Sequence, residues 1–220
     1  KILANPNVCN KEWIWQQYDQ TVMGDTIQKP GGDAGVVRIH KTNKAVAASV
    51  DSSAIYCWAH PLTGGKQIVC ESWRNLISVG AEPIAITNCL NFGNPEKEEN
   101  MGEFVECVQG LGEASKYLNF PVVSGNVSFY NQTKEKSIKP TPSIGGVGLI
   151  NDYRQMITMD LKKIGNIVLI IGKTNSVNFI IDLNYFSLCE QRLVIINGNN
   201  FTLKGDLINN SVEIFTIYNN

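Results

Sequence analysis

The stretch from residue 83 to residue 130 most constrains the fold, because an apolar strand, a long helix and a second apolar strand follow one another along it. The runs PIAITNCLNF (83–92) and PVVSGNVSFY (121–130) have the apolar character and length of buried strands. Asn94-Pro95 between them is typical of a helix start, with a capping side chain before a proline. We expect a helix over 95–118 whose apolar face comprises Met101, Phe104, Val105, Val108, Leu111, Ser115 and Leu118.

The flanking segments extend this pattern to a sheet with helices on one face. AGVVRIH (34–40) and KAVAASV (44–50) are short apolar strands joined by a tight loop, which predicts a hairpin. Residues 65–79 repeat apolar positions at helical spacing, and Gly80 suits the position after a helix end. Further expected elements are a helix over 10–23 capped by Asn10, a turn at 29–32, a glycine-rich strand at 144–150 and a strand at 166–172. This order predicts an α+β fold built as a mixed α/β layer.

The composition changes after about residue 174. Residues 175–220 contain ten asparagines, few charges and no clear period. The segments IIDLNYF (180–186) and RLVIING (192–198) have strand character, and no helix of convincing length is predicted there.

Charge and cysteine usage exclude several classes of protein. The net charge is -1 and the pI about 6.2, so no basic field attracts nucleic acid or an anionic membrane surface. The longest apolar run, Ile167 to Ile171, is far shorter than the roughly 20 residues of a membrane span, and the N-terminal residues lack the apolar region of a secretory signal. None of the six cysteines forms a C-x-x-C pair. We therefore expect reduced core thiols in a cytoplasmic protein.

Several catalytic motifs are incomplete. IGKTN (171–175) lacks the glycine of a phosphate-binding loop, since Ile167 occupies its place. The two histidines, His40 and His60, have no serine or cysteine partner at a recognisable spacing, so no nucleophilic triad and no catalytic residue is assigned. Asp33 and Asp51 each fit either a cation ligand or a turn.

The stretch SGNVS (124–128) combines three groups that suit a ligand site. Gly125 allows close approach of a phosphate to bare backbone, and the Asn126 side-chain oxygen is a neutral hard ligand for Mg²⁺ or Ca²⁺. The Ser128 hydroxyl can donate to an oxygen and lies on the same strand face as Asn126. A β-bulge or Asx turn before a hairpin is the alternative. A second polar strand end, with Asn88 in TNCLNFGNPE (87–96) before a helix start, favours the ligand site.

Three long motifs in register resemble one enzyme family. TNCLNFGNPEK, PVVSGNVSFYN and PTPSIGGVGLI resemble the synthetase subunit of phosphoribosylformylglycinamidine synthase, the formylglycinamide ribonucleotide amidotransferase of purine biosynthesis. QYDQTVMGDTIQKPGGDAGVVR and VCESWRNLISVGAEPIAIT fit the same family. The resemblance runs from about Ala4 to about Thr174, and it is to the N-terminal-type domain of the subunit's second half.

The resemblance implies both an architecture and an activity. The implied domain, residues 1–159, is like that of aminoimidazole ribonucleotide synthetase and pairs its sheet with the first half of the synthetase into a barrel. Residues 160–220 would begin a C-terminal α/β domain, truncated or degenerate after about 174. The implied reaction is ATP-dependent amidation of formylglycinamide ribonucleotide by a carbon–nitrogen ligase. ATP and Mg²⁺ are the implied cofactors, and a glutaminase subunit supplying ammonia from glutamine and a small assembly subunit are the implied partners.

The resemblance also assigns roles to four residues. Gly125 corresponds to an ATP contact, Asn126 to a Mg²⁺ ligand and Ser128 to a substrate contact. Asn88 corresponds to a position where some members have an ATP-contacting aspartate, so a charge is missing here.

Other departures leave the site incomplete. The family's catalytic histidines lie in its first half, and the aligned segment here, DSSAIYCWAHP, has a single histidine. The Arg-Asp pair of that half corresponds to Arg74 and Asn75. The isolated chain is therefore expected to be an inactive fragment. The rival interpretations are a non-catalytic nucleotide-binding or scaffold domain, another enzyme of the same superfamily, and the inactive product of a degraded gene.

Overall fold

The computed structural model describes residues 5–6, 9–159, 167–171, 192–195 and 212–216. The chain divides into two units, Lys1–Thr158 and Met159–Asn220. The helices of the first unit are α1 (Glu12–Trp15), α2 (Ala54–Ala59), α3 (Pro61–Ser78) and α4 (Glu98–Tyr117), with short 3-10 turns at Val22–Gly24 and Tyr153–Gln155. Its strands are β1 (Thr26–Gln28), β2 (Gly35–Arg38), β3 (Ala45–Asp51), β4 (Glu82–Asn91), β5 (Val122–Ser128), β6 (Gln132–Thr133), β7 (Lys136–Ser137) and β8 (Thr141–Ile150).

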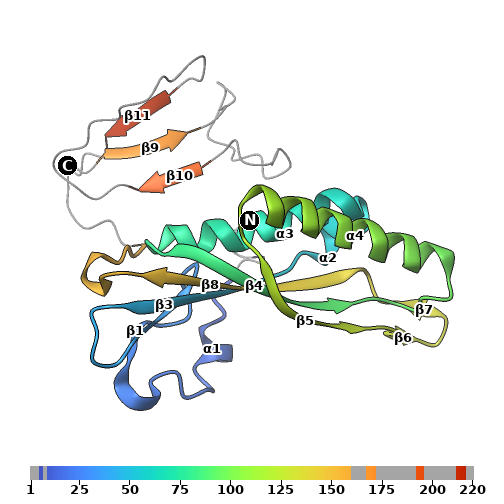
Figure 1. Ribbon diagram of the computed structural model, residues 1–220, viewed down its shortest axis with the longest axis horizontal. Coiled ribbons are helices and arrows are strands. Elements are labelled where there is room, and N and C mark those ends of the chain that lie inside the picture. Colours follow the sequence, from blue (N-terminus) through green and yellow to red (C-terminus); the bar gives the residue numbers. More distant parts are fainter. Residues whose placement is uncertain (1–4, 7–8, 160–166, 172–191, 196–211, 217–220) are drawn as a thin grey trace. The chain divides into compact units, whose positions relative to one another are not determined.

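Six strands form one mixed sheet in the order β1-β2-β3-β8-β4-β5 (Figure 1). Only β4 and β5 run parallel, because α4 connects them, and every other pair in this sheet is antiparallel. The predicted hairpin is confirmed as β2 and β3, with Ala45 opposite Arg38. The long strands at 83–92, 121–130 and 144–150 are confirmed as β4, β5 and β8.

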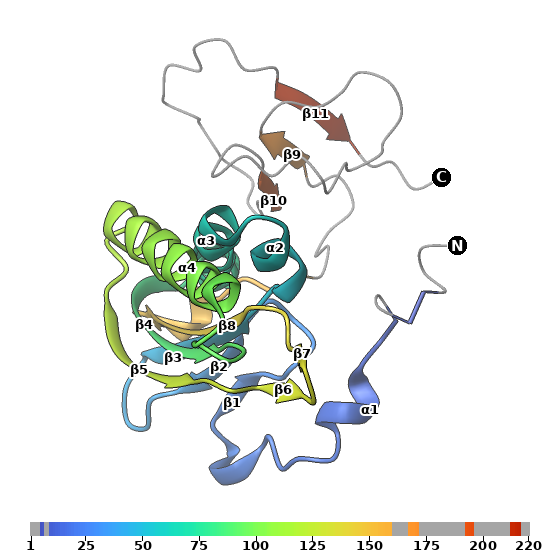
Figure 2. The ribbon, with the colours of Figure 1, turned by 90° about the vertical axis from the view of Figure 1, so that its right-hand side faces the viewer.

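The helices α2, α3 and α4 cover one face of this sheet, and the segment carrying α1 lies on the other side (Figures 1 and 2). The core lies between α3 and the sheet, where Ile68, Leu76, Ile86 and Ile144 are buried. Burying apolar side chains from helix and strands together is what stabilises such a layer. The predicted α+β class, with helices on one face, is confirmed.

Helices α3 and α4 approach each other closely through glycines. A Cβ atom on Gly65 of α3 would meet the backbone of Cys107 in α4, and one on Gly110 of α4 would meet the backbone of Leu62 in α3. The predicted apolar face of α4 is therefore partly wrong. Small residues make the helix contact, while Met101, Val105 and Val108 are exposed.

Glycines of β8 have a similar packing role. A Cβ atom on Gly146 would overlap the hydroxyl of Ser72 in α3 and lie 3.2 Å from that of Ser49 in β3. This confirms the expectation that the glycine-rich strand lies where neighbouring segments come close. Gly80 has a φ of 84° directly after α3, as its predicted position past a helix end requires.

Two predicted helix boundaries are wrong. The helix expected over 10–23 is reduced to α1, because residues such as Trp13, 66% exposed, find no core to pack against. The predicted cap is also wrong, because the N-cap residue of α1 is Lys11, which makes no side-chain cap bond; the Asn10 side chain accepts from Glu12 N at 2.7 Å. Asn94 likewise accepts from Glu96 N at 2.9 Å, but it closes a turn, and α4 begins only at Glu98.

The described residues of the second unit form a three-stranded antiparallel sheet in the order β10-β9-β11. Its strands are β9 (Ile167–Ile171), β10 (Arg192–Ile195) and β11 (Val212–Thr216). β9 and β10 match predicted strands, and the strand predicted at 180–186 lies outside the described residues. Within the described part of the chain, no helix has the length and apolar character needed to cross a membrane.

The described cysteines are free thiols, as expected. Cys57, Cys70 and Cys107 are buried, Cys89 is half-buried and Cys9 is exposed. Cys189 lies outside the described residues.

Candidate functional site

The four predicted site residues lie on the neighbouring parallel strands β4 and β5. Asn88 is opposite Gly125, Cys89 is opposite Asn126, and Asn91 is opposite Ser128. β5 is the outermost strand of the sheet, and Asn126 is exposed while Ser128 is half-buried. Fold and sequence together therefore place all four residues at one edge of the sheet.

The strand alternation divides these residues between two faces. Asn88 pairs with Ile144, and Leu90 with Pro142, both of which are fully buried under the helices. Asn88 and Gly125 thus belong to the helix-covered face. The residues between them belong to the opposite face, which we call the open face: Cys89, Asn91, Asn126, Ser128, Thr141 and Ser143.

The bare backbone of Gly125 has a close neighbour within the chain. A Cβ atom at this position would overlap the side-chain oxygen of Asn88 and lie 2.9 Å from its Cγ atom. A side chain at this position would have to displace the Asn88 carboxamide, so Gly125 leaves room for that group, whether or not a phosphate also approaches. The two predicted cofactor-binding residues are in direct contact with each other.

An aromatic cluster holds the ends of the two strands. Phe92 follows β4, Phe129 follows β5, and Phe104 of α4 packs edge-on against both, with ring centroids 5.2 and 5.0 Å away. Phe92 is fully buried. Edge-to-face aromatic packing contributes about 0.5–1.5 kcal/mol per pair beyond burial, so the cluster fixes Asn91 and Ser128 relative to α4.

The open face near the site is uncharged. β5 and β8 contain no charged residue, and β4 contains none after Glu82. Asn126 can supply one neutral oxygen to Mg²⁺, which proteins usually bind through one or two carboxylates together with phosphate oxygens. Within the described residues, no group of three or more His, Cys, Asp or Glu side chains is placed to hold a metal ion. Asn126 thus fits one ligand position of an ion that phosphates carry, and this face does not fit a site that holds the ion alone.

A buried carboxylate lies in the same row of the helix-covered face. Asp51 of β3 pairs with Ile144, which pairs with Asn88. Its oxygens accept bonds from Ser49 Oγ at 2.8 Å and Asn75 Nδ2 at 2.6 Å. Burial raises the pKa of Asp51, and these hydrogen bonds only partly oppose that effect. The sequence leaves open a cation ligand or a turn for Asp51. In the structure its buried carboxylate is hydrogen-bonded to Ser49 and Asn75 at the end of β3.

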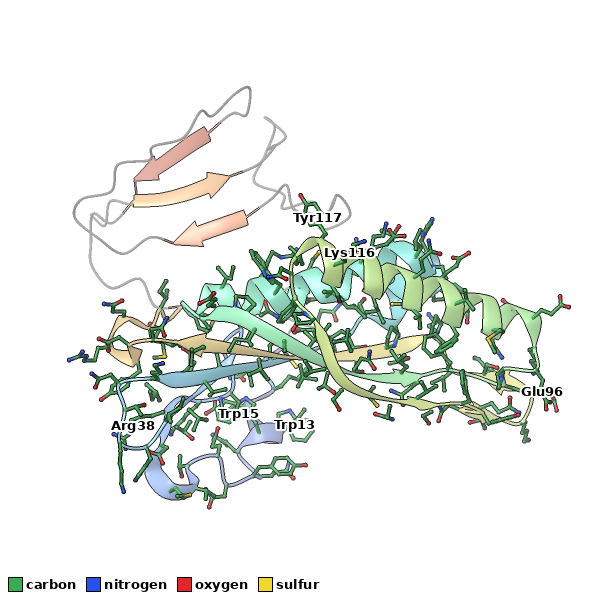
Figure 3. All side chains as sticks on the ribbon, viewed as in Figure 1. Trp13, Trp15, Arg38, Glu96, Lys116 and Tyr117 are labelled. Atoms are coloured by element: carbon green, nitrogen blue, oxygen red, sulfur yellow. The ribbon has the colours of Figure 1, made fainter. Side chains whose placement is uncertain are left out.

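A separate charged cluster surrounds Arg38. Figure 3 shows Arg38 and Glu96 at opposite ends of the sheet. Arg38 Nη2 donates to Asp25 at 2.9 Å, and His40 Nδ1 lies 2.9 Å from the other oxygen of that carboxylate. The Arg38 hydrogen bond holds the pKa of Asp25 below its usual value. A pocket of about 500 Å³ beside it is lined by Arg38, His40, Lys41, Thr42 and Asn43, and by none of the predicted site residues.

Sequence reasoning missed one residue that contacts the site. The Asn131 side chain donates to Ser128 Oγ at 3.1 Å and to the Ser128 carbonyl at 2.9 Å. Its only signal in the sequence is an amide three residues after the serine in SFYN.

Comparison with known proteins places the first unit in a family. Residues 31–150 match the family described as AIR synthase related protein, N-terminal domain. Phosphoribosylformylglycinamidine synthase subunit PurL of Pelagibacter ubique (strain HTCC1062) is 86% identical over 174 residues, which are 79% of this chain and 24% of that protein. The chain thus spans about a quarter of the length of the curated relatives that it matches.

Solved structures agree with this assignment. PurLQS from Thermotoga maritima has a TM-score of 0.67 and 30% identity, over 77% of this chain and 28% of that chain. T. maritima PurL complexed with ATP has a TM-score of 0.63 and 31% identity, over 77% and 27% of the two chains. T. maritima PurL complexed with FGAR has a TM-score of 0.62 and 34% identity, over 74% and 26%. The chain therefore belongs to the AIR synthase related protein family, whose N-terminal domain it carries, and within it is similar to phosphoribosylformylglycinamidine synthase subunit PurL.

Proposed function

We propose that this chain forms one wall of the nucleotide and ribonucleotide site of a phosphoribosylformylglycinamidine synthase. The reaction is the ATP-dependent amidation of formylglycinamide ribonucleotide to formylglycinamidine ribonucleotide in purine biosynthesis, a carbon–nitrogen ligation with glutamine as amido donor. The observation that carries the proposal is the shared position of Asn126 and Ser128 on the open face of the edge strand β5. The 86% identity to subunit PurL and the ATP and FGAR complexes of the T. maritima protein support it.

Each residue has a distinct proposed role. Gly125 and Asn88 contact the nucleotide from the sheet edge, and Asn126 supplies one oxygen to a Mg²⁺ ion that the triphosphate carries. Ser128 donates a hydrogen bond to the ribonucleotide. No catalytic residue is assigned in this chain, so proton transfer belongs to the histidine-bearing first half.

Part of the open face is apolar and exposed to solvent. Strand alternation from Ser143 puts Val147 of β8 on this face, together with Val50 of β3, which pairs with Gly145. Val37, paired with Val46, lies on the same side, and all three valines are exposed, Val50 by 81%. An exposed apolar surface of this kind is typical of an interaction site. We propose that the sheet of the first half covers this face and completes the domain 1–159. The glutaminase and small assembly subunits are the further proposed partners, in the cytoplasm, and residues 160–220 begin the next domain.

A chimera tests the proposal. Residues 1–174 of this chain replace the matching quarter of the P. ubique subunit, and ribonucleotide-dependent ATP hydrolysis is measured with ammonia as nitrogen donor. We expect Asn126→Ala to raise the Mg²⁺ concentration at half-maximal rate about tenfold, the size of one lost polar contact. Ser128→Ala raises the ribonucleotide KM by about the same factor with the ATP KM unchanged.

The matched control is Asn43→Ala, which removes an exposed amide at the far end of the sheet. A folded chimera without activity, or site variants that behave like Asn43→Ala, would refute the proposal. The isolated 220-residue chain should show no turnover, and measured turnover would contradict its status as a fragment.

The identity of residue 88 favours one alternative function, a non-catalytic nucleotide-binding domain. The resemblance implies an aspartate here in some members of the family, and the neutral amide of Asn88 suits a site that binds nucleotide for structure alone. In that case Mg²⁺-dependent ATP binding would be lost in Asn126→Ala while turnover of the chimera stayed unchanged.

A further inference from the structure

The chain leaves β5 through a turn that is tied to the end of β4. Phe92 N donates to the Ser128 carbonyl at 2.9 Å, Tyr130 N donates to the Gly93 carbonyl at 3.0 Å, and Asn131 N donates to the Phe92 carbonyl at 3.1 Å. Tyr130 has a φ of 59°, a left-handed conformation that bulky residues rarely adopt. Surrounding contacts must fix such a conformation, and the three backbone hydrogen bonds above do so here.

The Asn131 carboxamide has a single chemically acceptable orientation. Its Nδ2 atom lies 3.1 Å from the Phe92 carbonyl oxygen and 2.9 Å from the Ser128 carbonyl oxygen. Carbonyl oxygens only accept hydrogen bonds, so the group facing both of them must be the NH₂ group. The orientation is therefore set by the backbone around the side chain.

This orientation determines what the Ser128 hydroxyl does. Nδ2 also lies 3.1 Å from Ser128 Oγ, but an amide nitrogen accepts no hydrogen bond, so the Ser128 hydroxyl cannot donate to it and can only share one of the two amide hydrogens with the carbonyl oxygens. Among the described residues, the hydroxyl hydrogen then has one acceptor, Asn131 Oδ1 at 3.5 Å, the outer limit of a hydrogen bond. A ligand oxygen at the usual distance of about 2.7–2.8 Å for such a bond would displace this contact.

We propose that Asn131 is a positioning residue that presents Ser128 to the ribonucleotide as a hydrogen-bond donor. The inference rests on the proposed function, since it takes the ribonucleotide contact of Ser128 as given. Ser128 then selects an acceptor oxygen, such as a phosphate or formyl oxygen, and disfavours a donor group at the same place. Asn131 acts only through Ser128 and does not touch the ligand.

A double-mutant cycle in the full-length chimera tests this inference. The variants are Ser128→Ala, Asn131→Ala and the double variant, with Gln132→Ala as control because its exposed amide is the next side chain along. We expect Ser128→Ala and Asn131→Ala each to raise the ribonucleotide KM about tenfold, and the double variant to raise it no further than Ser128→Ala does. Gln132→Ala and the ATP KM should stay unchanged.

A second substitution at Asn131 distinguishes the positioning role from a general folding defect. Asn131→Asp keeps the shape but offers only acceptors when ionised, so it takes the Ser128 hydrogen and should raise the ribonucleotide KM more than Asn131→Ala does. Lowering the pH protonates this carboxyl and returns a donor, so the KM ratio to the parent chimera should fall. Thermal unfolding of each variant of the 220-residue chain reports stability separately.

The outcomes separate the two proposals. Independent, multiplying effects of Ser128→Ala and Asn131→Ala on KM, or no effect of either Asn131 substitution, would overturn the positioning role and leave the proposed function standing. A Ser128→Ala variant with an unchanged ribonucleotide KM would overturn the substrate contact and the positioning role together.

Discussion

Replacing Gly110 by alanine tests how closely α4 packs on α3. A Cβ atom there would overlap the Leu62 carbonyl oxygen and lie 3.0 Å from the Leu62 carbonyl carbon and 3.2 Å from Lys66 N. These are backbone atoms, which cannot rotate aside as a side chain can, so the helices must separate. Overpacking costs up to about 3 kcal/mol, and the helix propensity of alanine recovers about 1 kcal/mol. We expect a net loss of about 2 kcal/mol in the free energy of unfolding.

The same helix provides a matched control. A Cβ atom on Gly112 would meet nothing within 4 Å, so Gly112→Ala should stabilise the chain by about 0.5–1 kcal/mol through propensity alone. Urea unfolding followed by far-ultraviolet circular dichroism compares the two, since the described helices all lie in the unit Lys1–Thr158. With a slope of about 2 kcal/mol per molar urea, the Gly110→Ala midpoint should fall by about 1 M. Equal midpoints for the two variants would refute the close helix contact.

Three further predictions follow from other parts of the chain. Burial raises the pKa of Asp51, so ionising its carboxyl group lowers the stability of the chain as the pH rises through that raised pKa. Asp51→Asn should therefore melt at a higher temperature than the parent chain above that pKa, and at the same temperature under acid conditions. A difference in melting temperature that does not depend on pH would contradict this. The exposed valines of the open face should make the isolated chain self-associate, and Val50→Asp, which places a charge there, should reduce this in sedimentation; an unchanged distribution would exclude that face. Iodoacetamide should label the exposed Cys9 under native conditions and leave the buried Cys57 and Cys107 unlabelled until the chain unfolds, as peptide mass mapping can show.

The sequence predicted the elements whose side chains carry a clear pattern. The strands β4 and β5 and the hairpin of β2 and β3 were all correct, because their apolar runs are bounded by turn residues. The face of α4 was only partly correct: Phe104, Leu111, Ser115 and Leu118 are buried or pack on the core, but the contact of α4 with α3 is made at Gly110, and glycine gives no hydropathy signal. The helix expected over 10–23 was wrong because periodicity cannot show whether a core exists for it to pack against.

The candidate site was predictable to a similar extent. Period-two alternation places Asn126 and Ser128 on one face and Gly125 on the other. It cannot show that the Asn88 carboxamide fills the space beside Gly125, because that contact depends on the register between two strands far apart in sequence. Asn131 was missed for a related reason, since its bonds to Ser128 exist only because the backbone turns back at Tyr130.

The neutrality of the strands around Asn126 has a consequence for the order of binding. Mg²⁺ gives up its hydration shell reluctantly, and one amide oxygen offers no negative charge in return. If Asn126 has its proposed role, the free ion should therefore not bind this chain measurably, and the metal should arrive already chelated by the nucleotide. Titrating the chain with magnesium chloride alone should release no heat of association, whereas the preformed chelate is the species that this surface is suited to receive.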